Sequence, residues 1–119
     1  MKKSLLIIFC AIAVSISCEE IINEINIENR TLELVAPSAG SNLTAGASIF
    51  SWETMEGARN YRIQIAKPNF NAPDQLIVDS LVTENNLSTT LTAGAYEWRV
   101  RGENGAYTST YTTRAFTIN

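Results

Sequence analysis

Short segments in which apolar and polar residues alternate constrain the fold of this chain more than any other feature of its sequence. In the clearest one, residues 95–101 (AYEWRVR), Tyr96, Trp98 and Val100 alternate with charged side chains. Successive side chains of a β-strand point to opposite faces, so this alternation predicts a half-buried strand. Six more segments of this kind, separated by turn-forming residues, lie at residues 31–37, 47–53, 60–66, 76–82, 86–92 and 111–118. Seven short strands and no long helical period predict an all-β sandwich in a chain long enough for one domain.

The apolar positions of these segments predict the core of the sandwich. Eight residues are expected to be buried there: Phe50, Trp52, Tyr61, Ile63, Leu91, Tyr96, Trp98 and Val100. Because the inner faces of two packed sheets lie about 10 Å apart, Trp98 is expected to face Trp52 across the sandwich. The last segment departs from the pattern, since Arg114 lies two and four residues before Phe116 and Ile118 and would therefore point to the same face as these apolar residues. A β-bulge or an edge position is needed there.

Three motifs in this order, FSWE, YRIQIA and LTAGAYEWRVRGEN, resemble those of a fibronectin type III domain. The resemblance covers residues 31–119 and implies a seven-stranded, immunoglobulin-like sandwich in which the segments around Tyr61 and Trp98 are neighbours. It also implies that the Tyr96 hydroxyl ties down the chain near Leu91, as tyrosine corners of related sandwiches do. FSWETMEGARNYRIQIA and GAYEWRVRGEN further resemble modules of surface proteins from Bacteroidetes-type bacteria.

Residues 1–17 have the features of a secretion signal. Lys2 and Lys3 precede an apolar run of twelve residues, Leu5–Ile16, which is shorter than the roughly 20 residues that a membrane-spanning helix needs. The run ends in SISC, which resembles the signal of a bacterial lipoprotein, cut before the cysteine that carries the lipid. Ser15 stands where that signal usually has a large aliphatic residue, so an ordinary secretion signal is the alternative.

After removal of the signal, Cys18 is the only cysteine left, so no disulfide can form within the mature chain. A lone thiol in an exported protein calls for an explanation. Acylation of Cys18 supplies one, and a free or intermolecularly paired thiol is the alternative. Residues 18–30 then form the lipidated cysteine and an acidic tether. The two glutamates after Cys18 resemble the export signal of surface lipoproteins in Bacteroidetes-type bacteria. This implies a lipid anchor in the bacterial outer membrane and exposure at the cell surface.

The charged composition excludes several classes of function. Without Lys2 and Lys3, seven basic side chains remain against twelve acidic ones, a net charge of −5, whereas binding of nucleic acid needs a basic patch. The chain has no histidine, the commonest metal ligand and the commonest general base near neutral pH. Glu53 and Glu56 are a carboxylate pair without an evident pocket. The sequence therefore predicts a non-catalytic protein that needs no metal or cofactor and binds no nucleic acid.

Three arginines are the first candidates for partner binding. Arg62, Arg99 and Arg101 would share one outer sheet face, where they could hold an anionic glycan or the carboxylates of a protein. In the alternative interpretation they form a solvated face and pair with Glu97 or Glu103, a type of contact that contributes only ~0–1 kcal/mol. We expect the solvated face.

The loops supply the remaining candidates. Phe70 and Tyr107 would be exposed rings of the kind that binding hot spots favour, or lids over the ends of the sandwich. We expect Phe70 to pack and the Gly105 turn to present Tyr107 to a partner. The triplet Asp79–Leu81 resembles an O-glycosylation signal of Bacteroides-type bacteria, with Ser80 as the acceptor. Together these features predict a lipid-anchored interaction module that binds a protein or a glycan at the cell envelope. A structural accessory subunit of an outer-membrane or cell-surface complex is the alternative.

Overall fold

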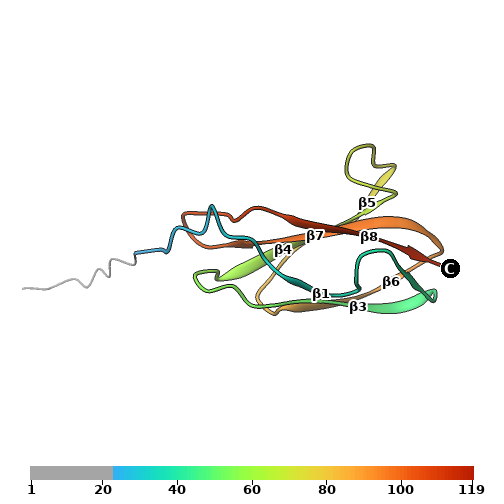
Figure 1. The fold of residues 1–119 in the computed structure, drawn as a ribbon, viewed down its shortest axis with the longest axis horizontal. Helices are drawn as coiled ribbons and strands as arrows, with labels where there is room; N and C mark the ends of the chain where they lie inside the picture. Colours follow the sequence, from blue (N-terminus) through green and yellow to red (C-terminus); the bar gives the residue numbers. More distant parts are fainter. Residues whose placement is uncertain (1–22) are drawn as a thin grey trace, which may run out of the picture.

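The computed structural model describes residues 23–119, so the predicted signal peptide and Cys18 lie outside the described residues. Eight β-strands form within them: β1 (Leu34–Ala36), β2 (Ser41–Leu43), β3 (Gly46–Trp52), β4 (Asn60–Lys67), β5 (Gln75–Val82), β6 (Asn86–Leu91), β7 (Gly94–Glu103) and β8 (Thr112–Ile118). They build two stacked sheets, one with the order β1-β3-β6 and one with the order β2-β8-β7-β4-β5 (Figure 1). The predicted all-β sandwich is confirmed.

β2 is the strand that alternation does not predict, because residues 38–46 have the composition of a loop. Beyond Pro37 the chain crosses from the three-stranded sheet to the five-stranded one. There β2 pairs in parallel with the end of β8. The backbone N–H of Gly40 begins this contact by donating to the carbonyl of Ala115 at 2.8 Å. The sandwich therefore has eight strands instead of the expected seven.

β4 and β7 lie side by side in the five-stranded sheet, as the resemblance implies, and β5 forms the edge beyond β4. The pairing of β4 with β5 shifts its register between Ile65 and Ala66. Leu76 lies opposite Ala66 and Leu81 lies opposite Arg62, so both leucines belong to the outer face. This irregularity explains why alternation within residues 76–82 does not reveal a buried face.

The hydrophobic core fills the space between the two sheets. All eight residues that alternation assigns to it are buried. The aromatic partner of Trp98 is Phe50, with ring centroids 5.1 Å apart, whereas Trp52 packs edge-on against Tyr61 at 5.8 Å. These pairs replace the expected contact of Trp98 with Trp52. Alternation shows which residues of a strand face inward, but not how far the two sheets are offset along their strands.

Two buried tyrosines use their hydroxyl groups to fix the chain outside the strands. The Tyr96 hydroxyl donates to the carbonyl of Thr92 at 2.6 Å, one residue beyond Leu91. The Tyr61 hydroxyl accepts a hydrogen bond from the backbone N–H of Met55 at 3.0 Å. Each hydroxyl thus has a partner, which avoids the cost of an unsatisfied polar group in the core.

Residues 24–32 pack along one end of the sandwich, and we call them the N-terminal strap. Ile27 is fully buried and approaches Gly57 so closely that a side chain at Gly57 would collide with it. Gly57 also adopts a φ of 93°, which favours glycine. The packed domain therefore starts before residue 31, and part of the segment that the sequence assigns to the tether belongs to the domain.

Polar contacts hold the strap to the loops that precede β4 and follow β7. Glu24 forms an ion pair with Arg59 at 2.7 Å. The Asn104 side chain donates to the carbonyls of Ile25 and Gly57, at 2.8 and 2.9 Å. The strap enters at one end of the sandwich, and the C-terminus lies at the opposite end (Figure 1).

Arg114 shares a face with the buried Phe116 and Ile118, and of the two alternatives expected for it, a bulge or an edge position, it occupies the edge position. β8 pairs with β7 in unbroken register, with Arg114 opposite Trp98, so there is no bulge in β8. β2 covers β8 only from Phe116 onward. Arg114 therefore lies in the uncovered part of β8, where it is half-buried.

Candidate functional site

The outer face of the five-stranded sheet gathers the arginines that the sequence singles out. In the antiparallel pairing of β4 with β7, Arg62 lies opposite Arg101 and Gln64 lies opposite Arg99. Residues directly opposite each other share a face, so the three arginines form one continuous group. We call Arg62, Arg99 and Arg101 the arginine row.

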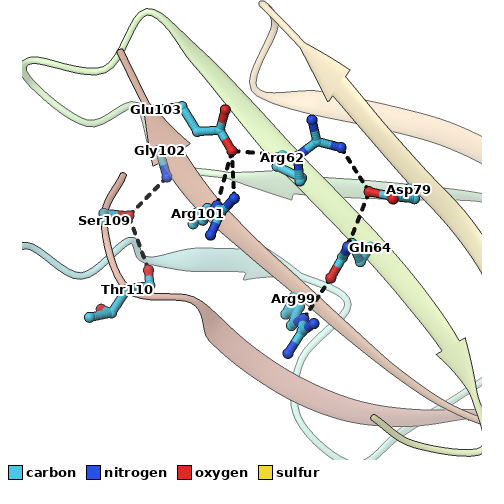
Figure 2. Close-up of polar contacts among 9 residues, drawn as sticks. All are labelled: Arg62, Gln64, Asp79, Arg99, Arg101, Gly102, Glu103, Ser109 and Thr110. Carbon is cyan, nitrogen blue, oxygen red and sulfur yellow. Dashed lines mark hydrogen bonds and ion pairs between the residues drawn. The ribbon is translucent and has the colours of Figure 1, made fainter. Parts of the chain in front are cut away.

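Two carboxylates, those of Asp79 on β5 and Glu103 on β7, pair with two members of this row (Figure 2). Arg62 Nη1 lies 2.8 Å from Asp79 Oδ1, and Arg62 Nε lies 3.4 Å from Glu103 Oε2. The same Glu103 oxygen lies 3.0 Å from both Nε and Nη2 of Arg101, and it accepts a hydrogen bond from Nε. The pairing with Glu103 is the one that the solvated-face interpretation expects.

Gln64 connects Arg99 to this network. Its Nε2 donates to Asp79 Oδ1 at 3.1 Å, and its Oε1 accepts from Arg99 Nε at 2.8 Å. The hydrogen bonds from Gln64 and Arg62 favour the charged carboxylate and lower the pKa of Asp79 below its ordinary value. The hydrogen bond to Asp79 in turn raises the pKa of Arg62. Both side chains therefore remain charged at neutral pH.

Arg99 is held between two aromatic rings. Its guanidinium carbon lies 4.0 Å from the centre of the Phe70 ring and 4.2 Å from that of Tyr111. Distances below about 6 Å give favourable cation–π contacts. Within residues 23–119, no carboxylate lies within ion-pair distance of Arg99. Phe70 thus packs onto the sheet face from the loop between β4 and β5.

The charges of this outer face balance one another. Three negative charges, those of Asp79, Glu97 and Glu103, accompany the three positive charges of the arginine row. Glu97 lies on the same face, opposite Ala66, and accepts a hydrogen bond from the backbone N–H of Phe70 at 3.0 Å. A face with balanced charges has little net attraction for an anionic ligand.

A cleft of about 340 Å³ opens on this outer face, at the end of the sheet remote from the strap. It lies between β2, β7, β8 and the loop that follows β4. Ala95 and Ala115 contribute methyl groups to it, and Asn42, Asn69 and Thr117 contribute polar side chains. Its volume falls within the ~300–1,000 Å³ that is usual for small-ligand sites.

Tyr107 does not form an outward tip. It is half-buried and packs against the core. Its backbone N–H donates to Asn104 Oδ1 at 2.8 Å, and the Asn104 N–H donates to its carbonyl at 2.9 Å. The strap lies against the same turn, because a side chain at Gly105 would meet the Glu24 carboxylate. The turn is thus closed, in place of the exposed binding tip expected from the sequence.

Ser80 lies opposite the fully buried Ile63, so its side chain belongs to the inner side of edge strand β5 and is half-buried. Its hydroxyl is therefore not displayed on the outer face. Glycosylation of Ser80 stays a prediction, as does lipidation of Cys18, which lies outside the described residues.

Sequence reasoning missed Tyr111 and the polar residues of the cleft. Tyr111 precedes β8 directly and also contacts Arg101, with 4.7 Å from the guanidinium carbon to the ring centre. The sequence does hold a signal for Asn69. The prolines at positions 68 and 73 indicate a structured loop, and a polar residue held in such a loop is a candidate for binding. No local pattern links Asn42 to Asn69, since only the unexpected strand β2 brings Asn42 to this face.

The described part of the chain shows no catalytic constellation. Glu53 and Glu56 are both exposed. No group of three or more acidic or cysteine side chains between residues 23 and 119 is placed to bind a metal ion. The same residues include no helix long and apolar enough to cross a membrane.

Comparison with solved structures shows that this is the fold of fibronectin type III domains. The chain is similar to the crystal structure of FN3tt, with a TM-score of 0.55 and 16% identity over 75% of this chain and 94% of that chain. The fibronectin type III domain of the human KIAA0970 protein gives a TM-score of 0.57 and 15% identity, over 80% of this chain and 76% of that one. The corresponding domain of the human collagen alpha-1(XX) chain gives 0.55 and 18%, over 75% and 81%. No protein-family model and no curated protein sequence matches the chain.

Proposed function

We propose that this protein is an exported, lipid-anchored and non-catalytic interaction module of the bacterial cell envelope, and that it binds its partner through the outer face of the five-stranded sheet. Fibronectin type III-like domains commonly serve as binding or structural modules, which supports the general class. The particular face is supported by the balanced polar network around Arg99 and by the adjoining cleft.

The position of the strap favours the cleft end of this face over the end of the domain at which the strap and the Gly105 turn lie. Five residues separate Cys18 from Glu24, and a fully extended chain spans at most ~22 Å between them. A lipid on Cys18 would therefore hold the strap end close to the membrane. The cleft lies near Ala95, about 27 Å further along β7 than Glu103 at ~3.4 Å per residue, so it would lie at the end of the domain remote from the anchor.

The single observation that carries the proposal is the fixed geometry of the outer face. Arg99 is held by two rings and by Gln64, and Glu97 is held by the backbone of Phe70. Side chains that are fixed before binding lose little conformational entropy when a partner docks. By contrast, the outer face of the three-stranded sheet presents small side chains around the exposed Ile49.

A structural accessory subunit is the second candidate, and strand β5 favours it. β5 is an edge of the five-stranded sheet, and its outer-face residues Leu76 and Leu81 are each 49% exposed. An edge strand offers unpaired backbone groups to which a strand of another protein can add. In this role the protein forms a stoichiometric complex along β5.

The anchor is tested by membrane fractionation of the full-length chain and of Cys18→Ser. We expect the parent in the membrane fraction with an acyl label, and the variant in the soluble fraction without it. Membrane partition that is unchanged by the substitution would remove the lipoprotein part of the proposal.

The binding face is tested by capturing partners from envelope extracts with two matched variants. Thr113→Tyr places a bulky ring opposite Arg99 on the proposed face, and Thr90→Tyr places the same ring on the outer face of the other sheet. We expect Thr113→Tyr to abolish capture and Thr90→Tyr to leave it unchanged. The reverse result would assign binding to the three-stranded sheet. Loss of capture in Leu81→Lys alone would favour the accessory role.

A further inference from the structure

We propose that the cleft between β2, β7, β8 and the β4–β5 loop binds a neutral oligosaccharide. The inference rests on the proposed function of the outer face and adds the chemical class of the ligand. It follows from three features of the cleft: the donors and acceptors that line it, the lack of a cationic side chain in its described lining, and the lack of a long free strand edge beside it.

Polar side chains of the cleft are fixed in place but keep hydrogen-bonding capacity. Asn69 Oδ1 accepts from the backbone N–H of Ala72 at 2.8 Å, and the Nδ2 group of Asn69 has no partner among residues 23–119. Glu97 Oε1 accepts from the backbone of Phe70 at 3.0 Å, while Glu97 Oε2 has no partner in that range. A ligand in the cleft can therefore accept a hydrogen bond from the Asn69 amide and donate one to the Glu97 carboxylate.

A second polar pair lies on the other side of the cleft. The Thr117 hydroxyl is hydrogen-bonded to Asn42 Oδ1. The threonine oxygen can still accept, and the asparagine Nδ2 can still donate. Ligand groups that both donate and accept match this lining best, and the hydroxyl groups of a sugar do both. Between the polar groups, the methyls of Ala95 and Ala115 and the ring of Pro68 offer apolar contact for the C–H groups of a sugar.

The charges around the cleft favour an uncharged ligand. Among residues 23–119, Glu97 is the only charged residue that lines it. The arginine row beside it is compensated by carboxylates and by aromatic rings. An anionic sugar would meet the Glu97 carboxylate in a lining that contains no cationic side chain among the described residues, and like charges at close range repel. The cleft therefore selects against acidic glycans.

A peptide strand fits this site less well than a sugar. Peptides that bind a sheet through their backbone need a free strand edge. The end of β8 that borders the cleft is already paired with β2, and β2 itself has only three residues.

The test uses the full-length chain carrying Cys18→Ser, purified after export, so that no lipid interferes. A panel of neutral hexasaccharides built from glucose, mannose, xylose and N-acetylglucosamine is titrated against it by calorimetry and by amide chemical shifts. We expect at least one to bind, with shifts concentrated at Asn69, Ala95 and Thr117. Ala115→Tyr fills the cleft and should weaken binding at least tenfold, whereas Ala47→Tyr, the same change at an exposed alanine of β3, should not.

Asn69→Ala provides a second variant in case Ala115→Tyr does not fold, and it should also weaken binding at least tenfold. No binding by any member of the panel, shifts outside the cleft, or stronger binding of hexagalacturonate would each overturn the inference. If no oligosaccharide of the panel binds but Thr113→Tyr still abolishes capture of an envelope partner, the binding face stands and only the neutral-sugar assignment is removed. If no oligosaccharide of the panel binds and Thr113→Tyr also leaves capture unchanged, both the neutral-sugar assignment and the proposed binding face are removed.

Discussion

Replacement of Ile27 by alanine should destabilise the domain far more than a change in a flexible tether could. Ile27 is 0% exposed and packs against Gly57, although the sequence places it before the first predicted strand. If the strap is part of the core, its truncation leaves a cavity that the rigid end of the sandwich cannot fully close.

The size of the loss follows from the groups removed. Alanine lacks three of the carbons of isoleucine, and each buried carbon contributes ~0.8 kcal/mol, so the transfer of these groups accounts for about 2.4 kcal/mol. The cavity adds to this, and measured Ile→Ala changes in cores fall at ~2–5 kcal/mol. We expect about 3–4 kcal/mol for Ile27→Ala, a large share of the ~5–15 kcal/mol that stabilises a typical domain.

Urea unfolding followed by tryptophan fluorescence measures this loss, because Trp52 and Trp98 are both buried in the core. Ile25→Ala is the matched control, since Ile25 lies in the same strap but is 42% exposed. It should cost less than about 1 kcal/mol, in line with substitutions near the surface. If Ile27→Ala lowers the free energy of unfolding no more than Ile25→Ala does, Ile27 is not part of the core and the strap belongs to the flexible tether.

Three further perturbations test the core and the outer face. Trp98→Ala should cost ~3–5 kcal/mol in the same assay, the usual loss for a buried large aromatic ring, and a loss below about 1 kcal/mol would contradict its place in the core. Arg99→Gln should cost about 1–2 kcal/mol, because it removes two cation–π contacts of ~0.5–1 kcal/mol each; a stability equal to that of the parent would mean that the rings do not hold the guanidinium. The pKa of Asp79 is lower in the folded protein than in the unfolded chain, so the unfolded chain binds the proton more readily. The charged Asp79 therefore stabilises the fold at a pH above the unfolded pKa of ~3.9, and this stabilisation is lost as the pH falls through the folded pKa. Asp79→Asn should therefore flatten the acid decline of the unfolding free energy below about pH 4, and parallel pH profiles for the two proteins would speak against that contribution.

Alternation predicted the centre of the fold because β7 follows it throughout and β4 follows it as far as Ile65, with every second residue buried. It failed where backbone pairing rather than side-chain polarity decides the structure. β2 has the composition of a turn and exists only because β8 offers it an edge. The register shift between β4 and β5 puts Leu76 on the outer face, where Leu81 also lies, and hides the pattern. Ile27 is buried by contacts with Gly57, a residue distant in the sequence.

The candidate site was predictable only in part for the same reason. Parity and the expected neighbours placed Arg62, Arg99 and Arg101 on one face, which is where they lie. Their partners were not predictable individually, because the position of Phe70 depends on how its loop folds back. The cleft joins β2 to that loop, so no local window of the sequence contains it.

Photo-cross-linking in intact cells reports which face of the domain meets a partner in the envelope. A photoreactive residue is placed at Thr113, on the outer face of the five-stranded sheet, and in a second strain at Thr90, on the outer face of the other sheet. Both positions are exposed, so both probes are equally free to react. We expect a discrete adduct from Thr113 and none from Thr90. An adduct from Thr90 alone, or from neither position, would contradict this expectation.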